Sequence, residues 1–365
     1  MGAHTKKIDR FFLISVSLLT VGGFIIFLSA SLGLLAQNNS SFEATALKQA
    51  ISLVLGIIAF FVCSKLPYTW IRKSALFIFI GAIVINLLLF IPAFSHLHGG
   101  ATRWLSIGSI SFQPSELLKI GFIIYLAAWI YFAKDKIKTI KFGLMPYLVI
   151  VAILSLLLLA QSDTDTLVVI AGTGLVMLII AGVPLRHMAI AGCIMAILVA
   201  GVIYTRPYAM KRVQTFFNKS ADTQGAGYQI NQSLIAIGSG QITGRGFGQS
   251  IQKFGYLPQP TDDSIFAVAG EEFGFIGTLL LLLLYLAFAT SVFRIGNRSP
   301  DIFGSLVAIG IAILIITESF MNIAAMLGLI PLSGMPLLFI SHGGTALIIT
   351  LMAAGIIANI SKHSR

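Results

Sequence analysis

Four carboxylates lie within one short stretch of the sequence, YLPQPTDDSIFAVAGEEFG, residues 256–274. The whole chain has only 13 acidic residues among 365, so this clustering needs a physical cause. Asp262 and Asp263 stand where a polar stretch ends and an apolar one begins. Aspartate is a common N-cap, so one of them could simply start a helix. Alternatively, a carboxylate partly withdrawn from water at that edge has a raised pKa, which suits a general base.

Glu271 and Glu272 follow about 12 Å deeper if the apolar stretch is helical. Glu318 lies in the middle of another apolar run. A charge inside a membrane span is costly unless it is paired or faces water. Two interpretations therefore stay open, a buried structural ion pair or carboxylates that line a hydrated cavity. The candidate cationic partners of Glu271 and Glu272 are Arg103, Lys119, Arg212 and Lys253.

A second cluster lies in FQPSELLKI, residues 112–120. Pro114 suits the first turn of a helix, and Glu116 there complements the helix dipole. Lys119 has no such structural explanation, and a cation at that depth is a candidate contact for an anionic group. Arg103 precedes this cluster on the same predicted outer loop.

Three further segments place polar groups beside apolar runs. Residues 210–258 are rich in glycine and basic side chains, so they could cradle a phosphate or lie on anionic lipid. In LIPLSGMPLLFISHGGTAL, residues 329–347, proline and glycine surround Ser341 and His342, which predicts a broken or re-entrant helix. QSDTDTL, residues 161–167, is typical of a tight polar turn.

The composition indicates a membrane protein with many spans. Hydrophobic residues make up 57% of the chain and charged residues 10%, whereas soluble domains have about 25% charged residues. The net charge of +11 favours contact with anionic membrane lipids, and no soluble domain remains that could hold nucleic acid. Cys63 and Cys193 lie in apolar runs, so neither is a candidate for a disulfide or a metal site. The first apolar run is expected to be a retained anchor.

Ten apolar runs have the length of transmembrane helices. Their approximate bounds are 11–35, 46–64, 74–93, 115–133, 144–160, 166–183, 187–204, 264–292, 303–329 and 336–360. An even number of spans puts both termini on one side, and the basic residues of the loops identify that side as the cytoplasm. Of the 24 Lys and Arg residues, that side holds Lys6, Lys7, Arg10, Lys65, Arg72, Lys73, Lys134, Lys136, Lys138, Lys141, Arg186, Arg294, Arg298, Lys362 and Arg365.

The acidic residues have the opposite distribution. Among the 13, only Asp9, Asp135 and Asp301 share the cytoplasmic side, so we expect the outer half of the protein to carry the chemistry. The sequence predicts an all-α polytopic protein, one membrane domain over 1–365, with ten transmembrane helices. Residues 205–262 would form a long extracytoplasmic loop between helices seven and eight, a length that is unusual unless functional. Carboxylates and cations around an outer cavity suit an amphiphile with an anionic head, such as a lipid-linked pyrophosphate sugar.

Four motifs, in order, resemble those of the SEDS family (shape, elongation, division and sporulation), which includes RodA and FtsW. GGATRWLSIGSISFQPSELLKI resembles the family's Gly-Ala-x-Arg-Trp loop and the Phe-Gln-Pro-Ser-Glu that follows it. GYQINQSLIAIGSGQITGRGFGQSIQKFGYLP resembles its long-loop signature, in which Tyr-Leu-Pro is closer to FtsW. PQPTDDSIFAVAGEEFGFIG resembles Pro-Glu-x-His-Thr-Asp-Phe-Ile-Phe-Ala with Gly-Glu-Glu, and PLSGMPLLFISHGG resembles Pro-Phe-Ile-Ser-Tyr-Gly-Gly. The resemblance covers nearly the whole chain.

The resemblance also shows where this chain departs from the family pattern. Alignment on the Ile-Phe-Ala of residues 265–267 puts the family's catalytic aspartate at Asp263. Asp262 then stands where the family usually has threonine, and His342 replaces a usual tyrosine. Two adjacent acids raise the question of whether they share the catalytic proton.

The family resemblance implies a peptidoglycan glycosyltransferase. Such an enzyme polymerises lipid II into β-1,4-linked glycan strands at the outer face of the bacterial cytoplasmic membrane, with inversion at the anomeric carbon and Asp263 as general base. A divalent cation, Mg²⁺ or Mn²⁺, could help to stabilise the departing diphosphate. Glu116, Glu271 and Glu272 could hold the substrate-binding cations in place or help to bind this metal. The residues expected to bind substrate are Arg103, Glu116, Lys119, Arg212, Lys253, Glu271, Glu272 and Ser341.

The expected partners are lipid II, the growing glycan strand, membrane lipids and a class B penicillin-binding protein. Two other functions stay open, a lipid II flippase and a non-catalytic scaffold that activates a partner synthase. Cell division and cell elongation both fit the sequence.

Overall fold

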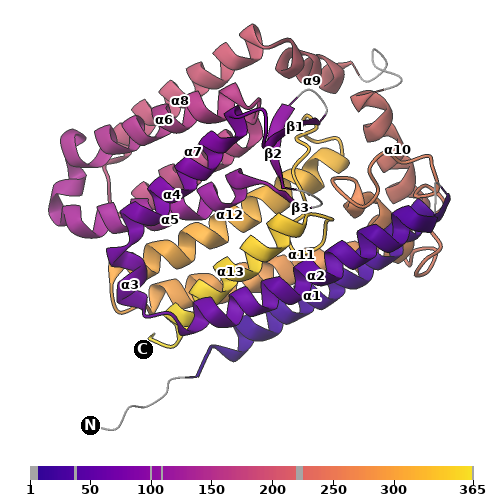
Figure 1. Ribbon diagram of the computed structural model, residues 1–365, viewed down its shortest axis with the longest axis horizontal. Coiled ribbons are helices and arrows are strands. Elements are labelled where there is room, and N and C mark those ends of the chain that lie inside the picture. The colour runs from indigo at the N-terminus through magenta and orange to yellow at the C-terminus, as the bar shows by residue number, and fades with distance from the viewer. Residues whose placement is uncertain (1–6, 37–38, 99–100, 108–109, 219–224, 364–365) are drawn as a thin grey trace.

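The computed structural model describes residues 7–36, 39–98, 101–107, 110–218 and 225–363, which form an elongated helical bundle (Figure 1). Some positions in the charge analysis and in the motifs lie outside the described residues, namely Lys6, residues 99–100, 108–109 and 219–224, and Arg365. Both chain termini lie at one end of the bundle. The opposite end carries α9 (Pro207–Phe217) and α10 (Ala226–Ser239), two helices within the predicted long loop.

The long helices follow the predicted apolar runs. They are α1 (Arg10–Ser31), α2 (Asn39–Lys65), α5 (Pro114–Ala133), α6 (Met145–Ala160), α8 (Leu185–Thr205), α11 (Ile265–Asn297), α12 (Ile302–Met326) and α13 (Gly344–Ser361). Among the described residues, eight helical segments are long and apolar enough to cross a membrane. Two shorter apolar helices, α4 (Ala75–Leu87) and α7 (Thr164–Ile180), occupy the third and sixth predicted spans. The helical membrane fold is confirmed, while the number of ten crossings and the single domain stay predictions.

Short elements connect these helices. They are α3 (Tyr68–Lys73), the 3₁₀ turns Leu32–Ala36, Leu88–Phe90 and Lys134–Lys138, and a π-helical turn at Ile140–Leu144. The loop before α5, which is predicted to lie on the outer side, contains a small antiparallel sheet, β1 (Ser95–His98), β2 (Ala101–Ile107) and β3 (Ile110–Phe112), in that order. The all-α prediction missed this sheet. Its strands pair because the backbone polar groups of a loop need partners, and neighbouring loop segments supply them.

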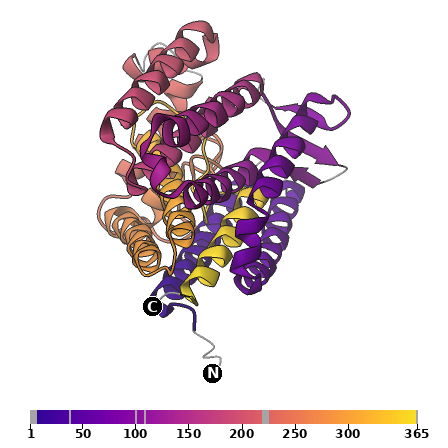
Figure 2. The ribbon, with the colours of Figure 1, turned by 90° about the vertical axis from the view of Figure 1, so that its left-hand side faces the viewer.

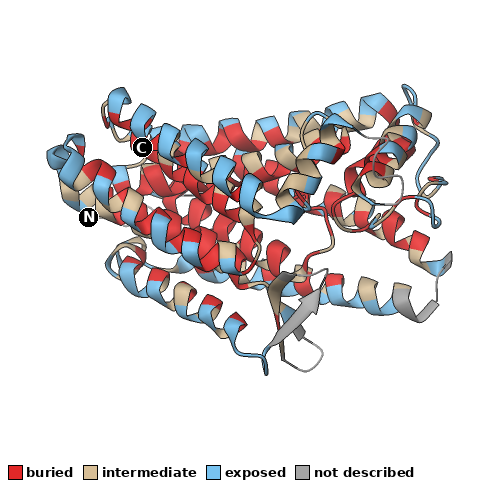
Figure 3. Cartoon of the chain, turned by 90° about the horizontal axis from the view of Figure 1, so that it is seen from above, coloured by how far each residue is buried: buried red, intermediate tan, exposed pale blue. Residues whose placement is uncertain are grey.

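Burial separates the central helices from the peripheral ones. The apolar segment of α13 is 83% buried and that of α12 is 72% buried, against 22% for α8. Figure 3 shows the buried residues concentrated in the interior of the bundle, and Figures 1 and 2 show α13 running beside α2. Polar side chains on the central helices are therefore remote from both water and lipid, so they must find partners within the protein.

A break in α11 positions the segment that contains the acidic cluster. Gly274 has φ 63° and ψ −162°, which interrupts the helix. The backbone groups freed there bond to the loop 241–246. Arg245 N donates to Glu271 O (3.0 Å), and Phe275 N donates to Gln241 O (2.9 Å). Irregular backbone at this depth is tolerated because protein satisfies it.

We expect Gly274→Ala to destabilise the protein by about 1–3 kcal/mol, since its backbone region is essentially restricted to glycine. A Cβ atom there would also lie 2.3 Å from the Gly244 nitrogen. The measurement is the apparent Tm of the purified protein in detergent. Gly81→Ala, in α4, is the matched control because its methyl group would meet open space. Equal Tm values for the two variants would contradict the importance of the break.

Candidate active site

Asp263 lies in a turn immediately before α11. Asp262 N and Ser264 N both donate to Gln259 O, at 3.1 Å and 3.3 Å, and so close the turn. Ser264 occupies the N-cap position of α11. The N-cap interpretation of the two aspartates is therefore wrong, because the chain enters the helix one residue later.

The Asp263 carboxylate is nearly enclosed, with 8% of the residue exposed. Gln229 Nε2, from α10, donates to its Oδ1 at 3.1 Å and to Ser264 Oγ at 2.9 Å. Withdrawal from water raises the pKa of Asp263 to about 6. The Gln229 hydrogen bond lowers this pKa, the charge of Asp262 raises it, and the charge of Arg212 lowers it. This carboxylate changes its protonation close to neutral pH, as general bases do.

A buried amide joins the Asp263 turn to the broken segment before α13. Asn322 Nδ2, near the end of α12, donates to Asp263 O and Met335 O, both at 2.7 Å. Ser341 Oγ donates to Asp262 O at 2.6 Å, and His342 N donates to Thr261 O at 2.7 Å. The predicted break in the last apolar run is confirmed, and its irregular backbone is docked against the acidic turn.

Arg212 is a predicted cation whose charge acts on the Asp263 carboxylate. It comes from α9, and its Nη1 lies 2.8 Å from Asp165 Oδ2 and 3.2 Å from Ser333 O. Gly334 (φ +64°) lies beside both charges. A Cβ atom there would lie 3.5 Å from Arg212 Nη2 and 4.0 Å from Asp263 Oδ2. The site thus holds a carboxylate and a fixed cation close to the same backbone position.

Lys119 lies elsewhere, in a buried cluster between α5 and α12. Its Nζ is 2.9 Å from Glu116 Oε1 and also bonds Glu318 Oε1. Lys119 is only 2% exposed, and the adjoining cavity of about 10 Å³ has room for no more than one water molecule. The two carboxylates explain why a lysine is tolerated at this depth. Its predicted contact with a substrate anion stays a prediction.

Three other predicted residues form a separate structural cluster. Lys253 Nζ lies 2.7 Å from Glu272 Oε1, and Ser29 Oγ donates to Glu272 Oε2 at 2.6 Å. Glu271 accepts from Ser250 Oγ at 2.6 Å and from two backbone nitrogens of the same loop. These contacts support the ion-pair interpretation of the two glutamates and show that they hold the loop 240–253 against α11.

Arg103, on β2, contacts the turn before α7. Its Nη2 donates to Ser162 O, and its Nη1 lies 3.7 Å from Asp163 Oδ1. Of the eight predicted substrate-binding residues, the structure therefore brings Arg212 and Ser341 to Asp263. The other six lie in the clusters around Lys119, Lys253 and Arg103, and a binding role for them stays a prediction.

Two residues that position Asp263 were not predicted from the sequence, and Asp165 was assigned only to a polar turn. Gln229 bonds the Asp263 carboxylate, Asn322 bonds its carbonyl, and Asp165 orients Arg212. An amide within an apolar run, as at Asn322, was the available signal, because a polar group there must have a partner. Gln229 carried no comparable signal, since it stands in a polar loop.

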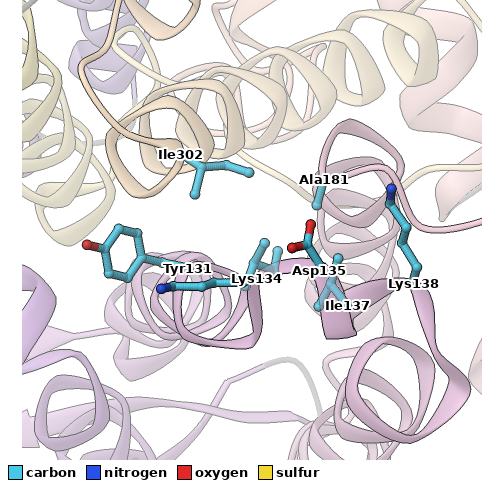
Figure 4. Close-up of a pocket in the computed structure, with 8 residues that line it drawn as sticks. Tyr131, Lys134, Asp135, Ile137, Lys138, Ala181 and Ile302 are labelled. Carbon is cyan, nitrogen blue, oxygen red and sulfur yellow. The ribbon is translucent and has the colours of Figure 1, made fainter.

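No three His, Cys, Asp or Glu side chains gather into a possible metal site within the parts of the chain that the structure describes. The residues present thus do not fit a metal held by protein ligands alone. A pocket of about 300 Å³ lies at the end of the bundle that carries the termini, lined by Tyr131, Lys134, Asp135 and Lys138 among others (Figure 4). It shares no residue with the site around Asp263.

The chain is similar to known proteins over almost its full length. The model of a family of cell cycle proteins, named for FtsW, RodA and SpoVE, matches residues 9–365. The chain belongs to this family. Among its relatives, this family member is 37% identical to stage V sporulation protein E of Bacillus subtilis (strain 168), over 97% of this chain and 96% of that protein. It is 33% identical to the probable peptidoglycan glycosyltransferase FtsW of Geobacter sp. (strain M18), over 98% and 97%.

Solved structures show the same fold. A chain of a peptidoglycan synthase complex superposes with a TM-score of 0.79 at 23% identity, covering 97% of both chains. The rod shape determining protein RodA of Thermus thermophilus superposes with a TM-score of 0.68 at 22% identity, covering 97% of this chain and 96% of that one. This family member is thus an integral membrane protein with the RodA fold.

We expect Lys253→Met to lower stability by about 3–5 kcal/mol, because removing one partner of a buried ion pair leaves the other charge unpaired. Thermal unfolding in detergent measures the loss. Lys48→Met is the matched control, since Lys48 is exposed on α2. If Lys253→Met kept the wild-type Tm and lost only affinity for lipid II, the structural role of Lys253 would be wrong.

Proposed function

We propose that this protein is a glycosyltransferase that polymerises lipid II into β-1,4-linked glycan strands, with Asp263 as the general base. The supporting observation is the nearly enclosed Asp263 carboxylate, whose pKa is raised by burial to about 6 and which lies, like Arg212, beside Gly334. Relatives named peptidoglycan glycosyltransferase share a third of the sequence over almost the full length.

The family resemblance implies the following reaction for these two charged groups. The C4 hydroxyl oxygen of the acceptor's N-acetylglucosamine bonds to the anomeric carbon of the donor's N-acetylmuramic acid, and Asp263 takes the hydroxyl proton. The bond from that carbon to the diphosphate oxygen breaks, and its electron pair leaves with undecaprenyl pyrophosphate. Attack from the opposite face converts the α linkage into a β linkage.

Arg212 is suited to stabilise the negative charge of the leaving diphosphate. Its guanidinium is held by Asp165 and the Ser333 carbonyl, so little reorganisation is needed when charge develops. Tyr208 lies under it, with 4.3 Å from the Arg212 Cζ to the ring centroid. A divalent cation, if used, would depend on oxygens of the substrate as well as protein groups, and no step here is assigned to it.

The orientation and the partner belong to the same proposal. The end with both termini carries the predicted excess of basic residues, which supports a cytoplasmic location for it. Asp263 then lies at the outer side, in the bacterial cytoplasmic membrane. A structural neighbour belongs to a complex that coordinates polymerisation with crosslinking, which supports a class B penicillin-binding protein as the partner here.

We expect Asp263→Asn to reduce the rate of polymerisation by roughly 10²–10⁴-fold, the usual contribution of a general base. The measurement is glycan chain formation from labelled lipid II by the purified protein, with and without its partner synthase. Asp135→Asn is the control, because it removes an exposed carboxylate at the opposite end of the bundle. Wild-type rates for Asp263→Asn would overturn the assignment of the base.

The same purified proteins and labelled lipid II distinguish the enzyme from the two alternative functions. A flippase would move labelled lipid II between leaflets of a vesicle without forming chains. A scaffold would form no chains by itself and would stimulate its partner equally well with Asp263→Asn. Loss of chain formation by this variant, with the partner still bound, supports the enzyme.

We expect polymerisation to lose rate as the pH falls through about 6. A base must be ionised to accept a proton, and burial raises the pKa of Asp263 to about 6, above its ordinary value. The activity is therefore present above this pH and is lost below it. This loss is measured as the acidic limb of the pH profile of kcat/KM for lipid II. A profile that stays flat to well below pH 6, taken with an intact fold, would contradict the raised pKa.

A further inference from the structure

Asp262 and His342, two positions where the chain departs from the family pattern, meet in space. His342 Nδ1 lies 3.2 Å from Asp262 Oδ1. They come from segments far apart in the sequence, the turn before α11 and the break before α13. The same two segments are already joined by the bonds of Ser341 Oγ to Asp262 O and of His342 N to Thr261 O. The pair is therefore held in place by the backbone around it.

Packing also fixes the histidine ring. It stacks on Phe27 of α1 with 5.8 Å between ring centroids and 19° between ring planes. The side chains of His342 and Asp262 are 31% and 45% exposed. Water thus reaches the pair, whereas the neighbouring Asp263 is nearly enclosed.

Among the charged groups around Asp263, Asp262 is the one whose negative charge can be offset to a varying degree. Arg212, from α9, has a partner of opposite charge in Asp165, from α7. The groups that α10 and α12 present, Gln229 and Asn322, are neutral. Asp262 is the adjacent carboxylate, and among the described residues its ionisable side-chain partner is His342.

We propose that Asp262 and His342 are a positioning pair that sets how tightly Asp263 holds a proton. This rests on the proposed role of Asp263 as the base. Histidine is the side chain that ordinarily changes charge near neutral pH. A neutral His342 leaves the charge of Asp262 unopposed, and Asp263 then holds a proton more tightly. A protonated His342 offsets that charge and favours ionised Asp263.

The consequence is that Asp263 stays ionised to a lower pH than it would if the charge of Asp262 were not offset. As the external pH falls, protonation of His342 opposes protonation of Asp263, because both groups act through the same charge on Asp262. Polymerisation then continues to a lower pH than an isolated buried carboxylate would allow. The proton lost from the acceptor still goes to Asp263, and the pair only changes how readily Asp263 takes and releases it.

The test is the pH profile of three variants. Asp262→Asn removes the negative charge at nearly constant shape. His342→Tyr keeps an aromatic ring for Phe27 and a hydroxyl for Asp262 but cannot become cationic. The third variant combines both. Initial rates of polymerisation from labelled lipid II give the midpoint of the acidic limb of kcat/KM for each protein, purified in full length with its partner synthase.

We expect the two single variants to move this midpoint in opposite directions, each by roughly 0.5–1 pH unit, as for a neighbouring charge that is partly exposed. Asp262→Asn lowers the midpoint, because a like charge next to Asp263 is gone. His342→Tyr raises it, because the charge of Asp262 is no longer offset. The double variant stays close to Asp262→Asn, since His342 acts through Asp262.

Midpoints that stay unchanged while the rate falls equally at every pH would show a structural role only and overturn the proposal. Shifts in the same direction would overturn it as well. If Asp262→Asn is not recovered folded, Asp262→Thr removes the same charge. Asp135→Asn, at the other end of the bundle, should leave the midpoint unchanged. Asp263→Asn separates the two hypotheses. Full activity of this variant refutes the role of Asp263 as the base. Loss of its activity, together with unshifted midpoints in the Asp262 and His342 variants, refutes only the role of the pair.

Discussion

The arrangement of the site depends on one buried amide. Asn322 donates to the carbonyls of Asp263 and Met335, each at 2.7 Å. Both carbonyls belong to irregular segments, and a buried carbonyl without a partner costs free energy comparable to a lost hydrogen bond. By satisfying both, a side chain of α12 fixes the turn that bears Asp263 against the segment that bears Gly334 and His342, together with the bonds that Ser341 Oγ and His342 N make to the same turn. The regular helices supply the frame, and these contacts hold the irregular parts together.

Much of the fold could be predicted, because the thickness of the bilayer and the need to pair backbone polar groups leave few possible structures for a membrane-spanning segment. Apolar runs of sufficient length must be helices, and proline with glycine in 329–347 indicated the break before α13. The break at Gly274 could not be predicted in the same way. It depends on bonds between α11 and the loop 241–246, which only the folded chain brings together. The small sheet before α5 depends likewise on pairing between loop segments.

For the candidate site, sequence alone identified the charged groups and left their pairing open. Asp263 could have been a cap or a base until the family resemblance singled it out. Lys119 and Lys253 were expected to face substrate, but packing gives each of them carboxylate partners inside the protein. Arg212 stays beside Asp263 because Asp165, from a different helix, holds it there. Which cation meets which carboxylate is decided by helix packing, and no local pattern contains that information.

The absence of a side chain at Gly334 also affects how the site could be inhibited. Gly334 lies beside Arg212 Nη2 and Asp263 Oδ2, and a Cβ atom there would be in ordinary contact with the two atoms, at 3.5 Å and 4.0 Å. A small compound with a hydrogen-bond donor for the carboxylate and an anionic group for the guanidinium would bind the same two groups. A larger residue at 334 would approach both of them, and the positive φ of 64° there favours glycine over any residue with a side chain.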